Sequence, residues 1–95
     1  MREIDYQLLL AAYRGDVEAI RKLIGQGADV HAQTGDGKTP LLLAAIVGQT
    51  DALRALIEAG ADVNVQDRYG KSALRWATER GHEVVVQLLR QAGAV

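Results

Sequence analysis

The segment most suggestive of chemistry is TGDGKTP, residues 34–40, in which Gly37-Lys38-Thr39 precedes a predicted helix. A Gly-Lys-Thr triplet can belong to a phosphate-binding loop, but that loop needs another glycine five residues before the second one. Ala32 occupies that position, and the preceding stretch is too short and polar to be the buried strand that such a loop follows. The triplet type returns as Gly70-Lys71-Ser72, 33 residues later. A triplet duplicated at a fixed interval favours a structural turn over a nucleotide site.

The histidines and the single serine offer no second chemical site. His31 and His82 are far apart in the chain and show no metal-ligand spacing, and a loop position and a helix start account for them. Ser72 is a predicted helix cap, with no histidine or acid placed beside it by the sequence. The sequence therefore predicts no enzyme, no cofactor and no metal.

Composition narrows the class of protein further. Ninety-five residues suit one small domain, and 48% are apolar, without phenylalanine or cysteine. Small aliphatic side chains favour closely packed helices. A net charge of −1 gives no broad attraction to nucleic acid or to anionic membranes. No apolar run approaches the roughly 18 residues of a membrane span or resembles a signal peptide. We predict a soluble, cytoplasmic protein.

A repeat of 33 residues organises the chain. Gly-Ala-Asp-Val occurs at 27–30 and 60–63, and Gly93-Ala94 begins a third copy. Other residues recur at the same interval: Gly15, Gly48 and Gly81; Ala11, Ala44 and Ala77; Leu23, Leu56 and Leu89. A period of this size predicts stacked supersecondary units. The expected organisation is one domain over 1–95, with units of approximately 1–33, 34–66 and 67–95.

The middle unit shows what each copy contains. A helix over 40–47 is predicted to begin after Thr39 as N-cap, with a proline at its first position, and to end at Gly48. A second helix over 49–59 is predicted to end before Gly60, in the left-handed conformation. An extended stretch with a turn leads to the next unit. Asp16, Gln49 and His82 open the three second helices, and we predict that each caps its helix.

The outer flanks of the first and last units are predicted to face solvent. Arg75 and Arg90 stand where earlier copies have leucine and isoleucine, and Lys22 stands where later copies have alanine and leucine. Polar outer flanks are typical of terminal repeats, so the array is expected to be whole and capped by its own residues. Leu10 should be partly exposed, and Trp76 should be buried against the middle unit. One exposed leucine contributes only about 1.5–3 kcal/mol when buried, so a monomer is expected.

The period, the order of elements and the words GKTPLLLAA, GADVNVQD and GHEVVVQLL resemble the ankyrin repeat over essentially the whole chain. Leu42 and Arg75 replace the signature histidine, Ser72-Ala73 replaces Thr-Pro, and the first unit begins with Tyr6-Gln7. The resemblance implies an all-α solenoid of three helix-turn-helix units joined by β-hairpin-like loops.

The resemblance also implies where a partner would bind. Hairpin tips and the exposed ends of the first helices form the concave side of such proteins. The residues predicted to bind a partner are Tyr13, Arg14, Lys38, Ile46, Val47, Arg68, Tyr69, Lys71 and Arg80. They differ between copies while the framework repeats, which favours contact residues; simple surface variation is the alternative. Lys38 is expected to point to solvent, so Lys38→Ala should change stability by less than about 0.5 kcal/mol.

Three functions remain in view from the sequence. The first is a non-catalytic module that binds a protein partner through its concave side. The second is an engineered or consensus-like scaffold without a dedicated natural partner, which the strong internal regularity leaves open. The third and most remote is a nucleotide-binding protein or enzyme, suggested only by the triplet at 37–39.

Overall fold

The computed structural model describes all 95 residues and contains six α-helices and no β-strand. The helices are α1 (Glu3–Arg14), α2 (Val17–Gly25), α3 (Pro40–Val47), α4 (Thr50–Glu58), α5 (Ala73–Arg80) and α6 (Glu83–Gln91). The helix over 40–47 has its predicted bounds, and the predicted helix over 49–59 is shorter by one residue at each end. The prediction of an all-α fold built from helix pairs is confirmed.

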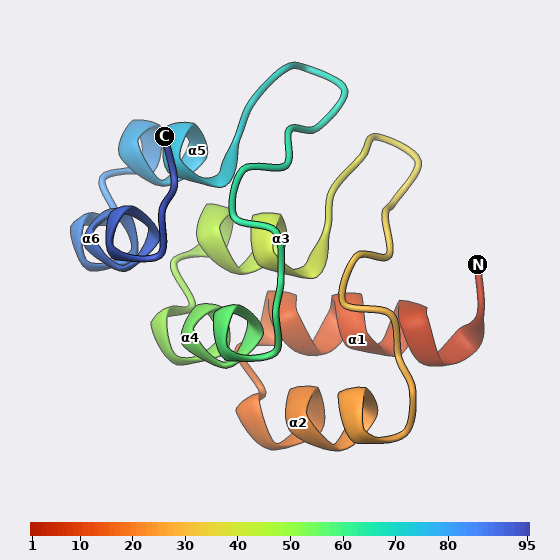
Figure 1. The fold of residues 1–95 in the computed structure, drawn as a ribbon. Helices are drawn as coiled ribbons and strands as arrows, with labels where there is room; N and C mark the ends of the chain where they lie inside the picture. The colour runs from red at the N-terminus through yellow and green to blue at the C-terminus, as the bar shows by residue number, and fades with distance from the viewer.

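The helix pairs stack in two rows. Figure 1 shows the first helices α1, α3 and α5 side by side, with α2, α4 and α6 in a second row beneath them. The loops at 26–39 and 59–72 project beyond the row of first helices, as hairpin-like arms. A single antiparallel bridge, between Gln66 and Ser72, is the only strand-like pairing. The chain therefore has an L-shaped cross-section, with helices in one limb and hairpins in the other.

Side-chain caps start the first helices of the second and third units as the sequence predicts. The Thr39 hydroxyl accepts a hydrogen bond from the Leu42 N–H at 3.2 Å, and Ser72 accepts one from the Arg75 N–H at the same distance. Helix α3 ends at Gly48, whose φ of +82° is readily adopted by glycine. Local sequence thus fixes both ends of α3 and α5, since α5 likewise ends at Gly81 in the left-handed conformation.

The predicted capping of the second helices is confirmed only for Asp16, which accepts a hydrogen bond from the Ala19 N–H at 3.1 Å. For Gln49 and His82 the prediction is wrong, because neither side chain caps its own helix. These longer side chains reach back to the preceding unit instead. Gln49 Nε2 donates to the Tyr13 carbonyl at 3.1 Å, and His82 Nε2 lies 3.1 Å from the Ile46 carbonyl.

The two contacts are equivalent, because Tyr13 and Ile46 are 33 residues apart. Each satisfies a carbonyl at the end of a first helix, where intrahelical donors run out. Glycine makes room for the incoming side chain. A Cβ at Gly48 would lie 2.7 Å from His82 Nδ1, and one at Gly15 would overlap the Gln49 amide. We call these contacts the inter-repeat ties.

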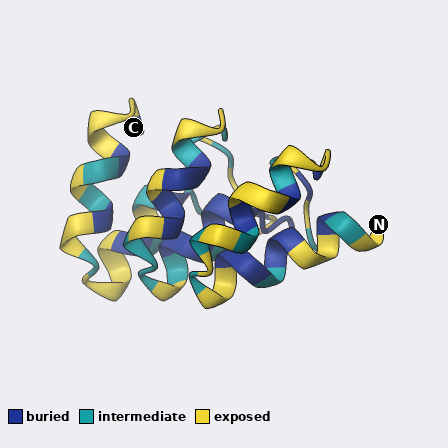
Figure 2. Cartoon of the chain, turned by 90° about the horizontal axis from the view of Figure 1, so that it is seen from below, coloured by how far each residue is buried: buried dark blue, intermediate teal, exposed yellow.

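The core is one continuous cluster of aliphatic side chains that runs through all three units. Figure 2 shows the buried residues in a band between the helices, with exposed residues on the outside. Ala11, Ala44 and Ala77, equivalent residues of the first helices, are all buried, and small side chains there allow close helix packing. The expectation of a core built from small aliphatic residues is confirmed.

The outer flanks also follow the sequence pattern. Arg75, Arg90 and Lys22 are exposed, and Leu10 is half-buried, as predicted. Leu9 and Leu42, the counterparts of Arg75 in the earlier units, are buried. No helix of the protein is both long enough and apolar enough to cross a membrane.

Candidate functional site

Lys38 is held by two carboxylates at the base of the hairpins. Its Nζ lies 2.9 Å from Asp67 Oδ2 and 3.0 Å from Asp36 Oδ2, and the residue is only 8% exposed. The prediction that Lys38 points to solvent is therefore wrong. The physical reason is an acidic partner in the next hairpin. Asp67 of the third unit stands where the middle unit has Thr34, and its carboxylate attracts the Lys38 ammonium away from solvent.

Asp67 is the centre of this arrangement, which we call the Asp67 network. Its Oδ2 also accepts a hydrogen bond from the Trp76 indole at 2.8 Å. Its Oδ1 accepts the backbone N–H groups of Tyr69 at 2.9 Å and Lys71 at 3.0 Å. Every buried side-chain nitrogen and oxygen of the protein has a hydrogen-bond partner. The carboxylate therefore fixes the hairpin, the tryptophan and the neighbouring lysine together.

The network remains ionised at neutral pH. Burial alone would raise the pKa of Asp67, but hydrogen bonds from Lys38, the Lys71 N–H and Trp76 outweigh it and hold the pKa far below its ordinary value. Burial alone would lower the pKa of Lys38, but its bonds to Asp67 and Asp36 raise it. The hydrogen bonds from Thr34 and Lys38 lower the pKa of Asp36.

Backbone contacts hold the two hairpins against each other at the same place. The Arg68 N–H donates to the Asp36 carbonyl at 3.0 Å. Gly37 has a φ of +83°, and a Cβ there would lie 3.2 Å from the Asp67 Cα. The glycine of the triplet thus permits close approach of the next hairpin, and the lysine is occupied by carboxylates. Gly37-Lys38-Thr39 is a turn followed by a helix cap.

Three cations surround the Trp76 ring. Its centre lies 4.4 Å from Lys71 Nζ, 5.3 Å from Lys38 Nζ and 5.5 Å from Arg80 Cζ. Lys38 Nζ is also 5.0 Å from the centre of the Tyr69 ring. Each such contact stabilises by about 0.5–1 kcal/mol at an exposed position. The structure therefore brings three of the predicted site residues, Lys38, Lys71 and Arg80, together around one tryptophan, and Lys38 links them to a fourth, Tyr69.

Trp76 itself was not predicted to belong to the site. It is half-buried, where the sequence predicted a buried side chain, because its indole edge bonds to Asp67 while its ring faces the three cations. A signal was present: it is the only tryptophan, at the position where earlier copies have Leu10 and Leu43. Glu79 was also not predicted to belong to the site. It forms ion pairs with Lys71 Nζ and Arg75 Nε, each at 2.9 Å. These two cations lower the pKa of Glu79.

The other predicted residues lie apart from the Trp76 cluster, along the same side of the stack. Tyr13 and Arg14 are exposed at the end of α1. Ile46 is half-buried and Val47 exposed at the end of α3. Arg68 is exposed at the tip of the second hairpin. We call the surface made by the hairpin tips and the exposed sides of α1, α3 and α5 the concave face.

An apolar hollow lies on the concave face beside α1. Its lining residues are Met1, Tyr6, Leu9, Leu10, Tyr13, Thr34 and Leu43. Tyr6 and Tyr13 are 50% and 55% exposed. The spacing of Tyr6, Leu10 and Tyr13 at i, i+4 and i+7 places them on one stripe of a helix. The sequence could therefore have indicated the hollow through this spacing. Of its lining residues, only Tyr13 was predicted to contact a partner.

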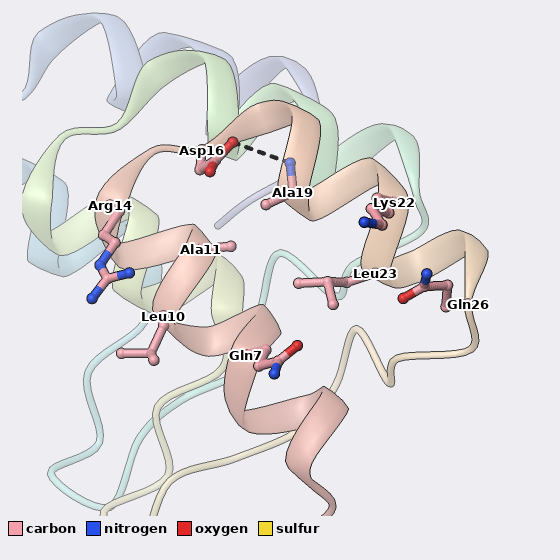
Figure 3. Close-up of a pocket in the computed structure, with 9 residues that line it drawn as sticks. All are labelled: Gln7, Leu10, Ala11, Arg14, Asp16, Ala19, Lys22, Leu23 and Gln26. Carbon is pink, nitrogen blue, oxygen red and sulfur yellow. Dashed lines mark hydrogen bonds between the residues drawn. The ribbon is translucent and has the colours of Figure 1, made fainter.

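A second hollow lies between α1 and α2 on the outer flank of the first unit. Figure 3 shows its lining residues: Gln7, Leu10, Ala11, Arg14, Asp16, Ala19, Lys22, Leu23 and Gln26. Asp16 is engaged with the Ala19 N–H there, as the dashed line marks. Across the whole protein, no three histidine, cysteine, aspartate or glutamate side chains are grouped to hold a metal ion. Neither hollow pairs a nucleophile with a base.

Stacked helix pairs with projecting hairpins define a repeat solenoid, a class in which successive units form one extended surface. A family model described as ankyrin repeats, in three copies, matches residues 8–95, and the chain belongs to the ankyrin-repeat family. Ankyrin repeats generally mediate protein–protein interaction, and the family is typically non-catalytic. No curated protein gives a significant match to the chain.

Proposed function

We propose that this protein is a non-catalytic module that binds a protein partner through its concave face. The supporting observation is where its large apolar side chains are exposed. Met1, Tyr6, Tyr13, Val47 and Tyr69 are exposed on or beside the concave face. The other exposed residues of this class are Val84 in α6 and the C-terminal Val95. Exposed apolar groups concentrated on one side favour a binding surface there.

The chemistry of the face fits recognition of a protein. Tyrosine, tryptophan and arginine are enriched among residues that dominate binding energy. Tyr69, Trp76 and Arg80 lie around a network that already fixes the hairpin and the indole, so less ordering is needed on binding. The residues proposed to contact the partner are Tyr13, Arg14, Ile46, Val47, Arg68, Tyr69, Lys71 and Arg80. Lys38 is proposed to support them from below.

A pull-down from lysate with the immobilised full chain tests the proposal. Tyr69→Ala and Val47→Ala should weaken retention of the partner, with a melting temperature close to that of the wild type. Arg54→Ala and Gln87→Ala, on the exposed side of α4 and α6, are matched controls that should retain it. Binding lost only in the controls would place the site on the opposite face. Retention of nothing would favour a scaffold without a dedicated partner.

The remaining parts of the proposal concern state and location. We propose a cytoplasmic monomer with no cofactor, and sedimentation at micromolar concentration tests the monomer. Nucleotide binding through Gly37-Lys38-Thr39 is disfavoured, because the ammonium of Lys38 is taken by Asp36 and Asp67. Titration with a nucleotide, followed through Trp76 fluorescence, tests that alternative, since the indole contacts the same carboxylate.

A further inference from the structure

The concave face has two chemically different ends. The end formed by α1 carries the apolar hollow, where Tyr6, Leu10 and Tyr13 lie on one stripe. The end formed by α5 and the second hairpin carries Lys71 and Arg80 beside the Trp76 ring, with Arg68 and Tyr69 exposed at the tip of the hairpin. Val47, at the end of α3, lies between the two ends and is exposed. A ligand that spans the face would meet apolar surface first and positive charge last.

The positive end has no free carboxylate of its own. Asp36 is bound to Lys38, and Glu79 is bound to Lys71 and Arg75. Arg68 and Arg80 are exposed and make no ion pair, and the same holds for Arg14. The arginines therefore have unused donors, while the acids beside them are already neutralised.

The second helices provide a contrast within the same molecule. Their exposed carboxylates and cations balance, four against four: Glu18, Asp51, Glu58 and Glu83 with Arg21, Lys22, Arg54 and Arg90. The whole chain carries a net charge of −1. With the second helices balanced, the rest of the chain also carries a net charge of −1. The positive charge of the concave face is therefore local: Arg68 and Arg80 are unpaired at its α5 end, where they can select a ligand by charge.

We infer that the partner presents an acidic segment in extended conformation, with one large apolar side chain in the hollow beside α1 and carboxylates on Arg80 and Arg68. This inference rests on the proposed function and specifies the partner's chemistry. Arg80 lies over the Trp76 ring, which leaves the edge of its guanidinium free for a carboxylate in bidentate geometry. The segment covers the apolar surface of the hollow and supplies the acids that the positive end lacks.

The stacking distance sets the spacing within the segment. Adjacent packed helices lie about 8–10 Å apart, so α1 and α5 are separated by roughly 16–20 Å. An extended chain rises about 3.3 Å per residue, so the apolar anchor and the acids should be about five or six residues apart. A helical segment would need roughly twice that number, because it rises only about 1.5 Å per residue.

Selection of random twelve-residue peptides displayed on phage, against the immobilised full chain, tests this inference. Enriched peptides should carry aspartate or glutamate about four to seven residues from a large apolar side chain. By fluorescence anisotropy, such a peptide should bind Arg80→Glu at least tenfold more weakly than wild type, and Tyr13→Ser likewise. Arg54→Glu, the matched charge reversal on α4, should bind like wild type. Each variant is first shown to melt cooperatively by circular dichroism.

The other outcomes separate the inference from the proposed function. Enrichment of neutral or basic peptides, whose binding is weakened by Val47→Ala and Tyr69→Ala, would overturn the inference that the partner is acidic. The proposal that the partner binds the concave face would remain. Enriched peptides weakened by Arg54→Glu and not by Arg80→Glu would overturn both. Enrichment of no peptide would overturn the linear segment, with the pull-down still deciding the proposed function. A single-stranded DNA 20-mer that binds as tightly as the acidic peptide would also overturn it, since charge alone would then explain binding.

Discussion

The ammonium of Lys38 and the carboxylate of Asp67 lie 2.9 Å apart and belong to hairpins of adjacent repeats. The Asp67 side chain is fully buried, so the pair joins the two hairpins away from solvent. The same carboxylate holds the indole of Trp76, around which Lys38, Lys71 and Arg80 gather. One buried ion pair therefore supports the second hairpin and the positive end of the concave face.

Lys38→Ala should destabilise the protein by about 1–3 kcal/mol, because it leaves the buried Asp67 carboxylate without its cation. Lys71→Ala is the matched control, since Lys71 is the equivalent residue one repeat later and pairs with the exposed Glu79. That pair should contribute only about 0–1 kcal/mol. Urea unfolding of both variants measures the difference. Equal losses would mean that burial of Lys38 has no energetic consequence.

The pKa of Asp67 predicts a loss of stability in acid. Its folded pKa lies far below the ordinary carboxyl value of 3.8, so its contribution is complete above about pH 4 and falls as pH drops toward the folded pKa. The melting temperature should therefore decline below about pH 4. Asp67→Asn should start lower and decline less steeply over the same range. Parallel curves for the two proteins would show that other carboxyls, such as Asp36 and Glu79, dominate acid unfolding.

Gly48→Ala should cost more than Gly81→Ala, although both glycines end first helices with similar φ angles of +82° and +74°. Each substitution carries a backbone cost of about 1–2 kcal/mol. Only at Gly48 does the new Cβ also meet His82, at 2.7 Å from Nδ1. Thermal melts give the excess, and His82→Ala in the Gly48→Ala background should recover part of it. Equal destabilisation by the two substitutions would show that the His82 side chain moves away from the new Cβ at no cost.

Thr39→Ala should destabilise by about 1 kcal/mol, because the Leu42 N–H loses its acceptor at the start of α3. Thr39→Ser keeps the hydroxyl and is the control for the cap itself. A Thr39→Ala variant as stable as the wild type would show that the Thr39 cap does not stabilise α3.

Gly60→Val tests the other end of the unit. Gly60 has a φ of +93°, and no atom lies within 4 Å of a Cβ placed there, so the expected cost of roughly 1 kcal/mol or more is backbone strain alone. Chemical denaturation measures all three variants.

The fold was predictable because each unit carries its own local signals. Thr39, Gly48 and Gly60 mark helix ends through side-chain capping and left-handed backbone, which need no knowledge of neighbours. The candidate surface was predictable as a set of positions that vary between copies.

The contacts within the surface were not predictable in this way. Register comparison aligns Lys38 with Lys71, whereas the folded protein joins Lys38 to Asp67. Likewise, His82 aligned with Asp16 predicts a cap, while its side chain contacts Ile46 of the preceding unit. Pairing between non-equivalent positions of adjacent units depends on the distance between hairpins, which the sequence alone does not state.

The inter-repeat ties have a consequence for how such a chain can lengthen. Each tie joins a glutamine or histidine at the start of a second helix to the end of the first helix of the preceding unit, next to Gly15 or Gly48. A tandem duplication of a 33-residue segment that contains Gln49 or His82 would copy the reaching side chain together with a glycine socket. The new copy would then fit both neighbours without further substitution. A segment that contains Asp16 instead would not, because Asp16 caps its own helix. Exchange of a single unit with an unrelated array would separate the reaching side chain of each tie from its carbonyl and glycine. The side chains at the new junctions would then need other hydrogen-bond partners.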